Sequence, residues 1–120
     1  MLNGYTLFAI GLAAVVNTAD VRPVVLHCHG HQVGSDQHPL TDQIITLDME
    51  KNVVVSIELL GKGRKDVINA PIDVSKKELR WTYDTLKFKY VFNRETLSLQ
   101  ISASPVGLLG VFDCETKDKI

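Results

Sequence analysis

Hydrophobic and polar residues alternate with a period of two along most of the chain after Pro23. In the segment 43–50, for example, Ile45, Leu47 and Met49 alternate with polar side chains. The same alternation is found in the segments 53–59, 78–84, 87–92 and 97–104. A period of two places successive side chains on opposite faces of a β-strand. The pattern therefore predicts a series of strands, each with one face in the core and the other in water.

The connections between these segments are short, so consecutive strands are expected to pair as antiparallel hairpins. Segments 24–29 and 108–115 complete a meander of seven or eight strands. Pro71 makes the segment 65–75 the least regular, and we expect an edge or bulged strand there. Because an open flat sheet leaves unpaired edges, the meander should close into a small barrel or a sandwich. The predicted fold class is all-β, with residues 20–120 forming one domain.

The facing of individual side chains follows from the same alternation. In the segment 53–59, the residues that share one face are Val53, Val55, Ile57 and Leu59. Aromatic residues at inward positions cluster on two adjoining strands, namely Trp81, Tyr83, Phe88, Tyr90 and Phe92. We expect these aromatic rings to form part of the core or to line a small cavity.

The segment from Tyr5 to Val16 has no charged residue and no proline. Its apolar run of about twelve residues is shorter than the ~20 that a membrane-spanning helix requires. Polar residues follow, and then the small residue Ala19. This order is typical of a secretory signal peptide cleaved after Ala19, so residues 1–19 predict a periplasmic or secreted protein with no stable membrane span. The alternative is a cytosolic structural domain with an ordered N-terminal helix.

The composition and the absence of known motifs exclude several classes of function. Of the 120 residues, 45% are hydrophobic and 22% are charged, and the formal net charge is −1. This is the composition of a globular domain, and it provides no basic surface for nucleic acid. The chain also has no phosphate-binding loop, no dinucleotide fingerprint and no nucleophile elbow. We therefore expect a non-enzymatic protein with no nucleic-acid partner.

The two cysteines lie near opposite ends of the predicted domain. Cys28 shares the inward parity of Leu26, and Cys114 shares that of Phe112. Two inward cysteines on the first and last strands of a closing sheet can meet, and in an oxidising compartment they would form a disulfide. In the chain-entropy description, closing a loop of this length stabilises the fold by roughly 4 kcal/mol. The alternative is a pair of separate buried thiols.

All four histidines fall within residues 27–38. His27, His29 and His31 occupy alternate positions of one strand, so they are expected on its outward face. Imidazoles in this arrangement can bind zinc or copper if a fourth ligand such as His38 or Asp36 completes the set.

Two features weigh against such a metal site. Gly30 favours a bend that would disturb the alignment of the imidazoles. The carboxylates that orient metal-binding histidines would also have to come from distant residues. The alternative is a solvated polar segment without a metal.

Three short motifs carry a resemblance to other proteins. Cys28-His29-Gly30 lies on an early strand, Asn93-Arg94-Glu95-Thr96-Leu97 in a middle hairpin, and Cys114 at the end of the last strand. In these motifs the chain resembles a diffuse group of small exported proteobacterial β-meander proteins of unknown function. That group usually has a glycine where this chain has Leu97. The resemblance implies export and a β-meander, but no activity, cofactor or partner.

A likeness of architecture extends to the periplasmic lysozyme inhibitors, which are also small disulfide-bearing β-barrels. Their serine-glycine loop, S-G-x-x-Y, is not present in this chain. Architecture alone does not transfer a function. The leading hypothesis is therefore an exported non-enzymatic β domain that binds a macromolecular partner or a small apolar ligand. The alternative function is metal binding through His27, His29 and His31.

Overall fold

The computed structural model describes residues 23–33, 40–118 and 120. Residues 1–19, which the sequence assigns to a signal peptide, lie outside the described residues. Asp36 and His38, the candidate fourth metal ligands, also lie outside them.

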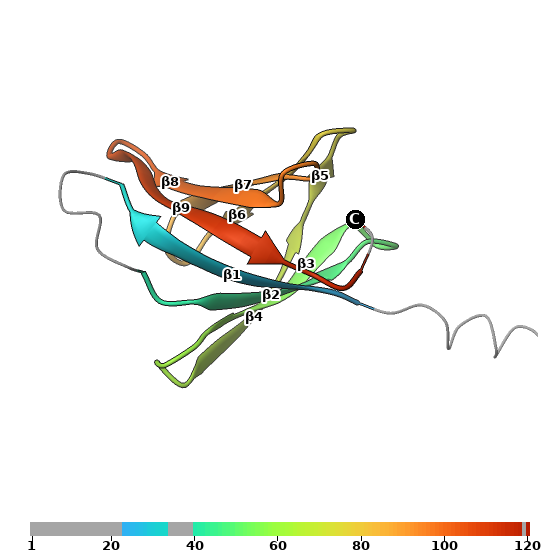
Figure 1. Cartoon of the computed structure of the whole chain (residues 1–120), viewed down its shortest axis with the longest axis horizontal. Coiled ribbons are helices and arrows are strands. Elements are labelled where there is room, and N and C mark those ends of the chain that lie inside the picture. The colour runs from blue at the N-terminus through green and yellow to red at the C-terminus, as the bar shows by residue number, and fades with distance from the viewer. Residues whose placement is uncertain (1–22, 34–39, 119) are drawn as a thin grey trace, which may run out of the picture.

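Nine strands follow one another along the described chain (Figure 1). They are β1 (Val24–Gln32), β2 (Gln43–Asp48), β3 (Val53–Leu59), β4 (Arg64–Pro71), β5 (Asp73–Val74), β6 (Glu78–Tyr83), β7 (Phe88–Asn93), β8 (Ser98–Ala103) and β9 (Gly107–Glu115). No helix occurs among the described residues. None of these residues, accordingly, belongs to a helix long and apolar enough to cross a membrane.

The nine strands form a single antiparallel sheet in the order β4-β3-β2-β1-β9-β8-β7-β6-β5. The first strand, β1, pairs with both β2 and the last strand, β9. The two edge strands, β4 and β5, are consecutive in the chain, so the sheet curls round until its edges approach each other (Figure 1). The all-β antiparallel meander is confirmed, and it takes the form of a nearly closed barrel-shaped sheet. The described residues form nine strands where seven or eight were expected, because the segment 65–75 divides into β4 and β5.

The segment 65–75 is irregular, as Pro71 led us to expect. Pro71 ends β4, and the backbone N–H of Ile72 donates to the carbonyl of Asn52 at 2.8 Å. From Asp73 the chain pairs instead with β6. The segment therefore pairs first with β3, on one side of the barrel, and then with β6, on the other. A proline lacks the N–H that a continuous ladder would need, which explains why the change of partner occurs here.

The inward faces of the strands form one apolar core. Its largest fully buried side chains are Tyr90, Phe92, Phe112, Leu26, Ile45, Leu47, Ile57, Leu79, Leu99, Val54 and Cys28. The rings of Trp81 and Tyr90 stack with their centroids 5.2 Å apart. Four of the five clustered aromatic residues therefore belong to the core, as their parity predicted, and Phe88 packs half-buried against it.

One expectation about side-chain facing is wrong. Val53 and Val55 were expected to share a face with Ile57, opposite Val54, but both are only half-buried, whereas Val54 and Ile57 are both buried. The register of β3 shifts between Val54 and Ser56 against β4, and it also shifts against β2. A β-bulge places one extra residue in a strand and reverses the facing on one side of it.

The disulfide expected from the sequence is present between Cys28 and Cys114. The two residues are direct partners in the β1–β9 ladder, with their Cα atoms 4.0 Å apart. Both side chains are buried. A disulfide is compatible with an oxidising, exported location. The bond joins the first and last strands at the place where the sheet brings them together.

Candidate metal centre

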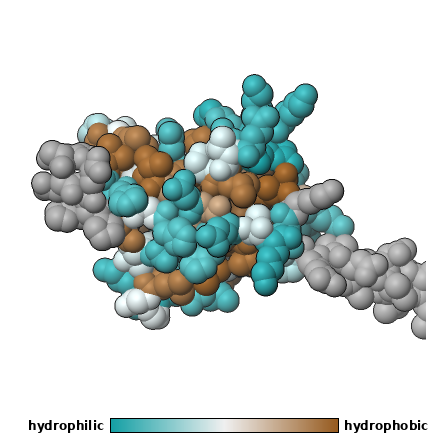
Figure 2. Space-filling model, viewed as in Figure 1, coloured by the Kyte–Doolittle hydropathy of each residue, from teal (hydrophilic) through white to brown (hydrophobic). Residues whose placement is uncertain are grey.

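The outward face of β1 carries the histidine cluster. Val24, Leu26 and Cys28 point into the core, while His27, His29 and His31 lie on the other face. The strand thus places all three imidazoles on the same side, as the period of two predicts. Hydrophilic residues cover the middle of the face along which β1 and β9 run (Figure 2).

Gly30 does not interrupt this arrangement, because β1 continues through it to Gln32. Gly30 faces inward and pairs with Phe112 of β9. A Cβ atom at this position would overlap the carbonyl oxygen of Val111 and the ring of Phe112. The glycine is therefore required by the close approach of β9, and the expected bend is wrong.

Asp42 approaches the histidines from the neighbouring strand. Cys28 is paired with Gln43, so Asp42 lies one residue before β2 and next to His29. The backbone N–H of Leu60 donates to the carbonyl of Asp42 at 2.9 Å, which holds this residue against the end of β3. Both constraints come from the backbone, so residue 42 is held beside His29 independently of its side chain.

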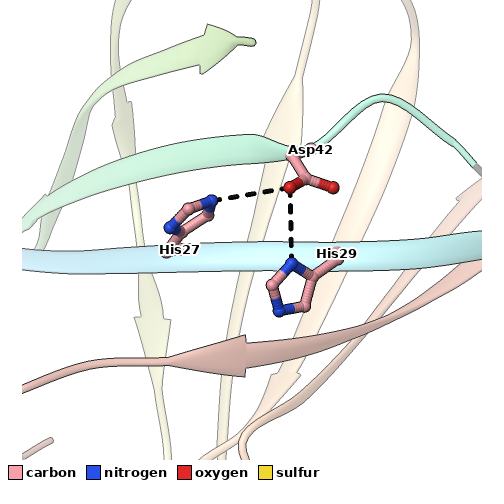
Figure 3. A group of neighbouring side chains, drawn as sticks. All are labelled: His27, His29 and Asp42. Atoms are coloured by element: carbon pink, nitrogen blue, oxygen red, sulfur yellow. Dashed lines mark hydrogen bonds and ion pairs between the residues drawn. The ribbon is translucent and has the colours of Figure 1, made fainter.

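The side chains of His27, His29 and Asp42 converge on one point (Figure 3). Nδ1 of His29 lies 3.3 Å from Oδ2 of Asp42, and Nε2 of His27 lies 3.6 Å from the same oxygen. One ligand atom from each residue falls within 4.8 Å of the other two. The two rings are inclined at 43° with their centroids 5.4 Å apart, so they do not stack on each other.

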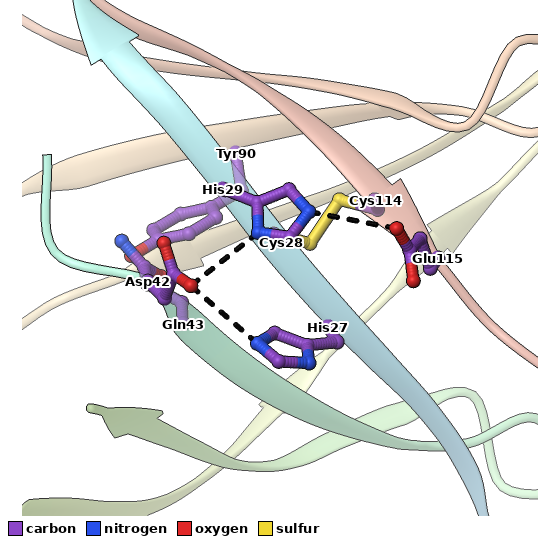
Figure 4. The surroundings of a disulfide bond; sticks show 8 residues. All are labelled: His27, Cys28, His29, Asp42, Gln43, Tyr90, Cys114 and Glu115. Carbon is purple, nitrogen blue, oxygen red and sulfur yellow. Dashed lines mark hydrogen bonds and ion pairs between the residues drawn. A yellow bond between two sulfur atoms is a disulfide. The ribbon is translucent and has the colours of Figure 1, made fainter. Parts of the chain in front are cut away.

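A second carboxylate approaches His29 from the other side (Figure 4). Oε2 of Glu115 lies 3.6 Å from Nε2 of His29. Glu115 is the last residue of β9 and is paired with His27 in the ladder. It follows Cys114, so the disulfide fixes the strand that carries it beside the strand that carries His29. An orienting carboxylate for the histidines had to come from a residue distant in sequence, and Glu115 is such a residue.

The site is open to solvent on one side. The exposed fractions of the side chains are 45% for His27, 48% for His29, 39% for Asp42 and 78% for Glu115. A surface hollow of about 560 Å³ adjoins His27 and is lined also by Val25 and residues 115–118. A small ion can therefore reach the cluster without any movement of the backbone.

The electrostatics of the cluster favour a positive charge. The hydrogen bond between His29 and Asp42 raises the pKa of His29 above its ordinary value of 6.5, and Glu115 adds to the effect. A cation in this position is stabilised by two carboxylates that face it from different strands. The same carboxylates would stabilise a metal ion bound in place of the proton.

Nε2 of His27 is the unsatisfied atom of the cluster. Although its side chain is half exposed, this nitrogen is itself buried and has no hydrogen-bond partner. Buried polar atoms nearly always have a partner, and those without one call for an explanation. Here the nitrogen points at the carboxylate of Asp42 from just beyond hydrogen-bonding distance (Figure 3). A metal ion shared by the two residues would give this nitrogen a partner.

Not every residue of the sequence-based ligand set joins this cluster. The convergent group consists of His27, His29 and Asp42 and does not include His31. His31 lies two residues further along β1, is exposed, and is paired with Val111.

Asp42 and Glu115 were missed by the sequence analysis. Asp42 needs the β1–β2 register, which no sequence pattern supplies. Glu115 could have been found, because a Cys28–Cys114 bond between antiparallel strands places residue 115 opposite residue 27.

Comparisons of the chain with known protein families, with curated proteins and with solved structures find no match. The function must therefore be argued from the site itself.

Proposed function

We propose that this protein is an exported β-barrel domain that binds a divalent transition-metal ion, zinc or copper, through His27, His29 and Asp42. The observation that carries the proposal is the convergence of two imidazole nitrogens on one carboxylate oxygen, at 3.3 and 3.6 Å. Ligand atoms bound to a tetrahedral zinc ion at 2.0–2.1 Å lie about 3.3 Å from one another. The two distances measured from Asp42 are thus close to those that a coordinated ion requires.

The donor set selects the class of metal. Calcium and magnesium prefer sites made entirely of oxygen atoms, whereas imidazole nitrogen suits zinc and copper. Two imidazoles with one carboxylate form a donor set that is also used for zinc in hydrolytic enzymes. Three protein ligands leave a coordination position for water or an incoming group. Because the site is half exposed, we infer reversible metal uptake and not a permanently enclosed structural ion.

Glu115 has the position of a supporting residue for this ion. If His29 binds the metal through Nδ1, its Nε2–H points at the carboxylate of Glu115. A carboxylate behind a metal-binding histidine fixes the ring orientation and raises the basicity of the ring. Glu115 would therefore act through His29 and would not itself contact the metal.

Titration calorimetry of the untagged, metal-free protein with zinc chloride tests the proposal. We expect one zinc ion per chain with a dissociation constant in the micromolar range or below. His29→Ala and Asp42→Asn should each weaken binding by about tenfold or more, because each removes one of three ligands. Copper should bind more tightly than zinc, following the general order of divalent-metal affinities.

His31→Ala is the matched control. It removes an exposed imidazole from the same face of β1, two residues from His29, and it should leave zinc affinity unchanged. Glu115→Gln should weaken binding without abolishing it. The proposal fails if the protein takes up no zinc or copper at micromolar metal, or if His31→Ala weakens binding as much as His29→Ala does.

We also propose that the chain is exported after cleavage behind Ala19. The buried Cys28–Cys114 disulfide supports this, because such bonds persist in oxidising compartments and are rare in the cytosol. Intact-mass analysis of protein made in a bacterium gives a direct test. The expected mass lacks residues 1–19 and is two hydrogen atoms lighter than the fully reduced chain. An uncleaved, reduced chain would contradict export.

A further inference from the structure

We infer that one end of the barrel binds a small, uncharged, apolar molecule that carries a single hydrogen-bonding oxygen. This site is separate from the metal centre, since it lies on the inward face of the sheet and the histidines lie on the outward face. It does not depend on metal binding, and each proposal can fail while the other stands.

A cavity of about 360 Å³ opens at the end of the barrel where β1 and β3 end and β2, β7 and β9 begin. Its lining is mostly apolar, with contributions from Leu40, Leu59, Phe88, Ile101, Leu109 and Phe112. Cavities of 300–1,000 Å³ lined in this way are typical of small-molecule sites, and the mouths of β-barrels are among their preferred locations.

A polar pair marks one wall of the cavity. The hydroxyl of Tyr90 donates to Oε1 of Gln43 at 3.3 Å, and both residues line the cavity. Burial raises the pKa of Tyr90 well above its ordinary value, so the hydroxyl stays protonated and neutral. The oxygen of Tyr90 can still accept a hydrogen bond, and the amide of Gln43 carries two N–H donors. A hydroxyl or carbonyl oxygen on the ligand matches this pair.

The lining also shows that the ligand should carry no charge. Among the described residues that line the cavity, there is no lysine, arginine, histidine, aspartate or glutamate. A carboxylate taken into this cavity would lose its hydration without gaining an opposite charge, which is strongly unfavourable. An alcohol, ketone or phenol of similar size meets no such penalty. The chemistry therefore favours neutral apolar molecules over fatty-acid anions.

The rim of the cavity offers an apolar entrance. Leu86 lies in the turn between β6 and β7, lines the cavity, and has 38% of its surface exposed. Leu40 and Leu109 lie half-buried nearby in the lining. Leu86 can be changed without removing a core side chain, which makes it suitable for a test.

Fluorescence titration of the full chain with 1-aminonaphthalene, a neutral probe, tests this inference. We expect saturable binding at one site with a blue shift in emission, and displacement of the probe by 1-octanol. Octanoate, which has the same chain length with a negative charge, should compete at least about tenfold more weakly. Tyr90→Phe should weaken 1-octanol binding by about fivefold, the effect of one hydrogen bond.

Leu86→Asp should weaken probe binding by about tenfold, because it places a charge at the apolar entrance. Val106→Asp is the matched control: Val106 is 72% exposed in the turn between β8 and β9 and does not line the cavity. This variant should bind the probe as the wild type does. Circular dichroism should show both variants folded.

NMR titration of the wild-type protein with 1-octanol gives a second measurement that needs no variant. Chemical shifts should move at Phe88, Ile101 and Leu109 and not at His27 or His29. The inference is overturned if neither probe nor 1-octanol binds saturably at millimolar concentration, if shifts map outside the cavity, if octanoate binds as well as 1-octanol, or if both aspartate variants lose binding equally.

Discussion

His29 lies between two carboxylates, with Nδ1 facing Asp42 and Nε2 facing Glu115. In the metal-free protein this arrangement favours the doubly protonated, positively charged ring, because each N–H then has an acceptor. If Nδ1 were to hold a metal ion, the proton there would be lost to solvent, and the carboxylate of Glu115 could still accept from the Nε2–H. The same side chain is therefore suited to both states.

The titration of His29 tests this arrangement of carboxylates. In the metal-free protein, its pKa measured by NMR should lie above 6.5, because the hydrogen bond to Asp42 favours the charged ring. Asp42→Asn should lower that pKa, since the amide cannot balance the charge. A His29 pKa at or below 6.5 in the wild type, or one unchanged by Asp42→Asn, would contradict the geometry described.

The raised pKa has a consequence for stability with a definite sign. Because the folded state binds the proton more tightly, the stabilising contribution is full below pH 6.5 and is lost as pH rises through the folded-state pKa. The difference in unfolding free energy between wild type and Asp42→Asn should therefore be larger at pH 5.5 than at pH 8.5. Urea denaturation at the two pH values measures it. The site is exposed, so we expect a small effect.

At the scale of single residues, the sequence shows which histidines are candidate ligands better than it shows which side chains lie beside them. His27 and His29 stand out because three histidines alternate on one strand. Asp42 carries no such signal, since an aspartate before a strand is usually only solvated. It becomes a candidate ligand through the pairing of Cys28 with Gln43, and that pairing depends on the tertiary register.

Strand β1 shows how one element can support both the core and the site. Its inward residues close the barrel against β2 and β9, while its outward residues present the imidazoles. Gly30 lies between His29 and His31 and allows β9 to approach closely. Any side chain at position 30 would push the two strands apart, and with them His29 and Glu115.

Gly30→Ala should consequently destabilise the protein. We expect a loss of about 1–3 kcal/mol, the usual effect of adding a methyl group to a filled interior, because the new Cβ would overlap Val111 and Phe112. Chemical denaturation followed by the fluorescence of Trp81 measures the change. His31→Ala, an exposed substitution on the same strand, should change the stability by less than about 0.5 kcal/mol. Equal stability of Gly30→Ala and wild type would show that β9 does not pack as described.

The strands could be located from the sequence, but their local irregularities could not. The bulge that buries Val54 leaves no mark in the sequence, because Val53, Val54 and Val55 are identical residues. Leu97 gives a different lesson. It has a positive φ of 60°, a left-handed conformation that favours glycine, and a leucine at this position gives no sign of that backbone.

On the scale of the whole molecule, the disulfide joins two strands that are distant in sequence and adjacent in space. Its partners are separated by 86 positions, so the bond spans most of the domain. The parity of Cys28 and Cys114, together with their places on the first and last strands, was enough to predict the pair. The choice between a barrel and a sandwich was not predictable, because it depends on how far the sheet curls before its edges meet.

Replacing both cysteines, as Cys28→Ala with Cys114→Ala, should lower the unfolding free energy by about 4 kcal/mol in the chain-entropy description. Zinc affinity of the folded variant should fall no further than in Glu115→Gln. The reason is that the cysteine side chains lie in the core, whereas His27, His29 and Asp42 are on the outward face and are still positioned by the β1–β2 ladder. Urea denaturation and calorimetry of the same sample check both statements. Unchanged stability, or complete loss of zinc binding in a folded variant, would contradict them.

Anomalous X-ray diffraction from zinc-loaded crystals, recorded on both sides of the zinc absorption edge, would locate a bound ion on β1 directly. We expect one strong peak about 2.0–2.1 Å from Nε2 of His27, Nδ1 of His29 and a carboxylate oxygen of Asp42. Glu115 should remain beside Nε2 of His29 without contacting the ion. The absence of a peak on this face of β1, or an ion bound by His31 with Asp42 uninvolved, would rule out the proposed metal centre.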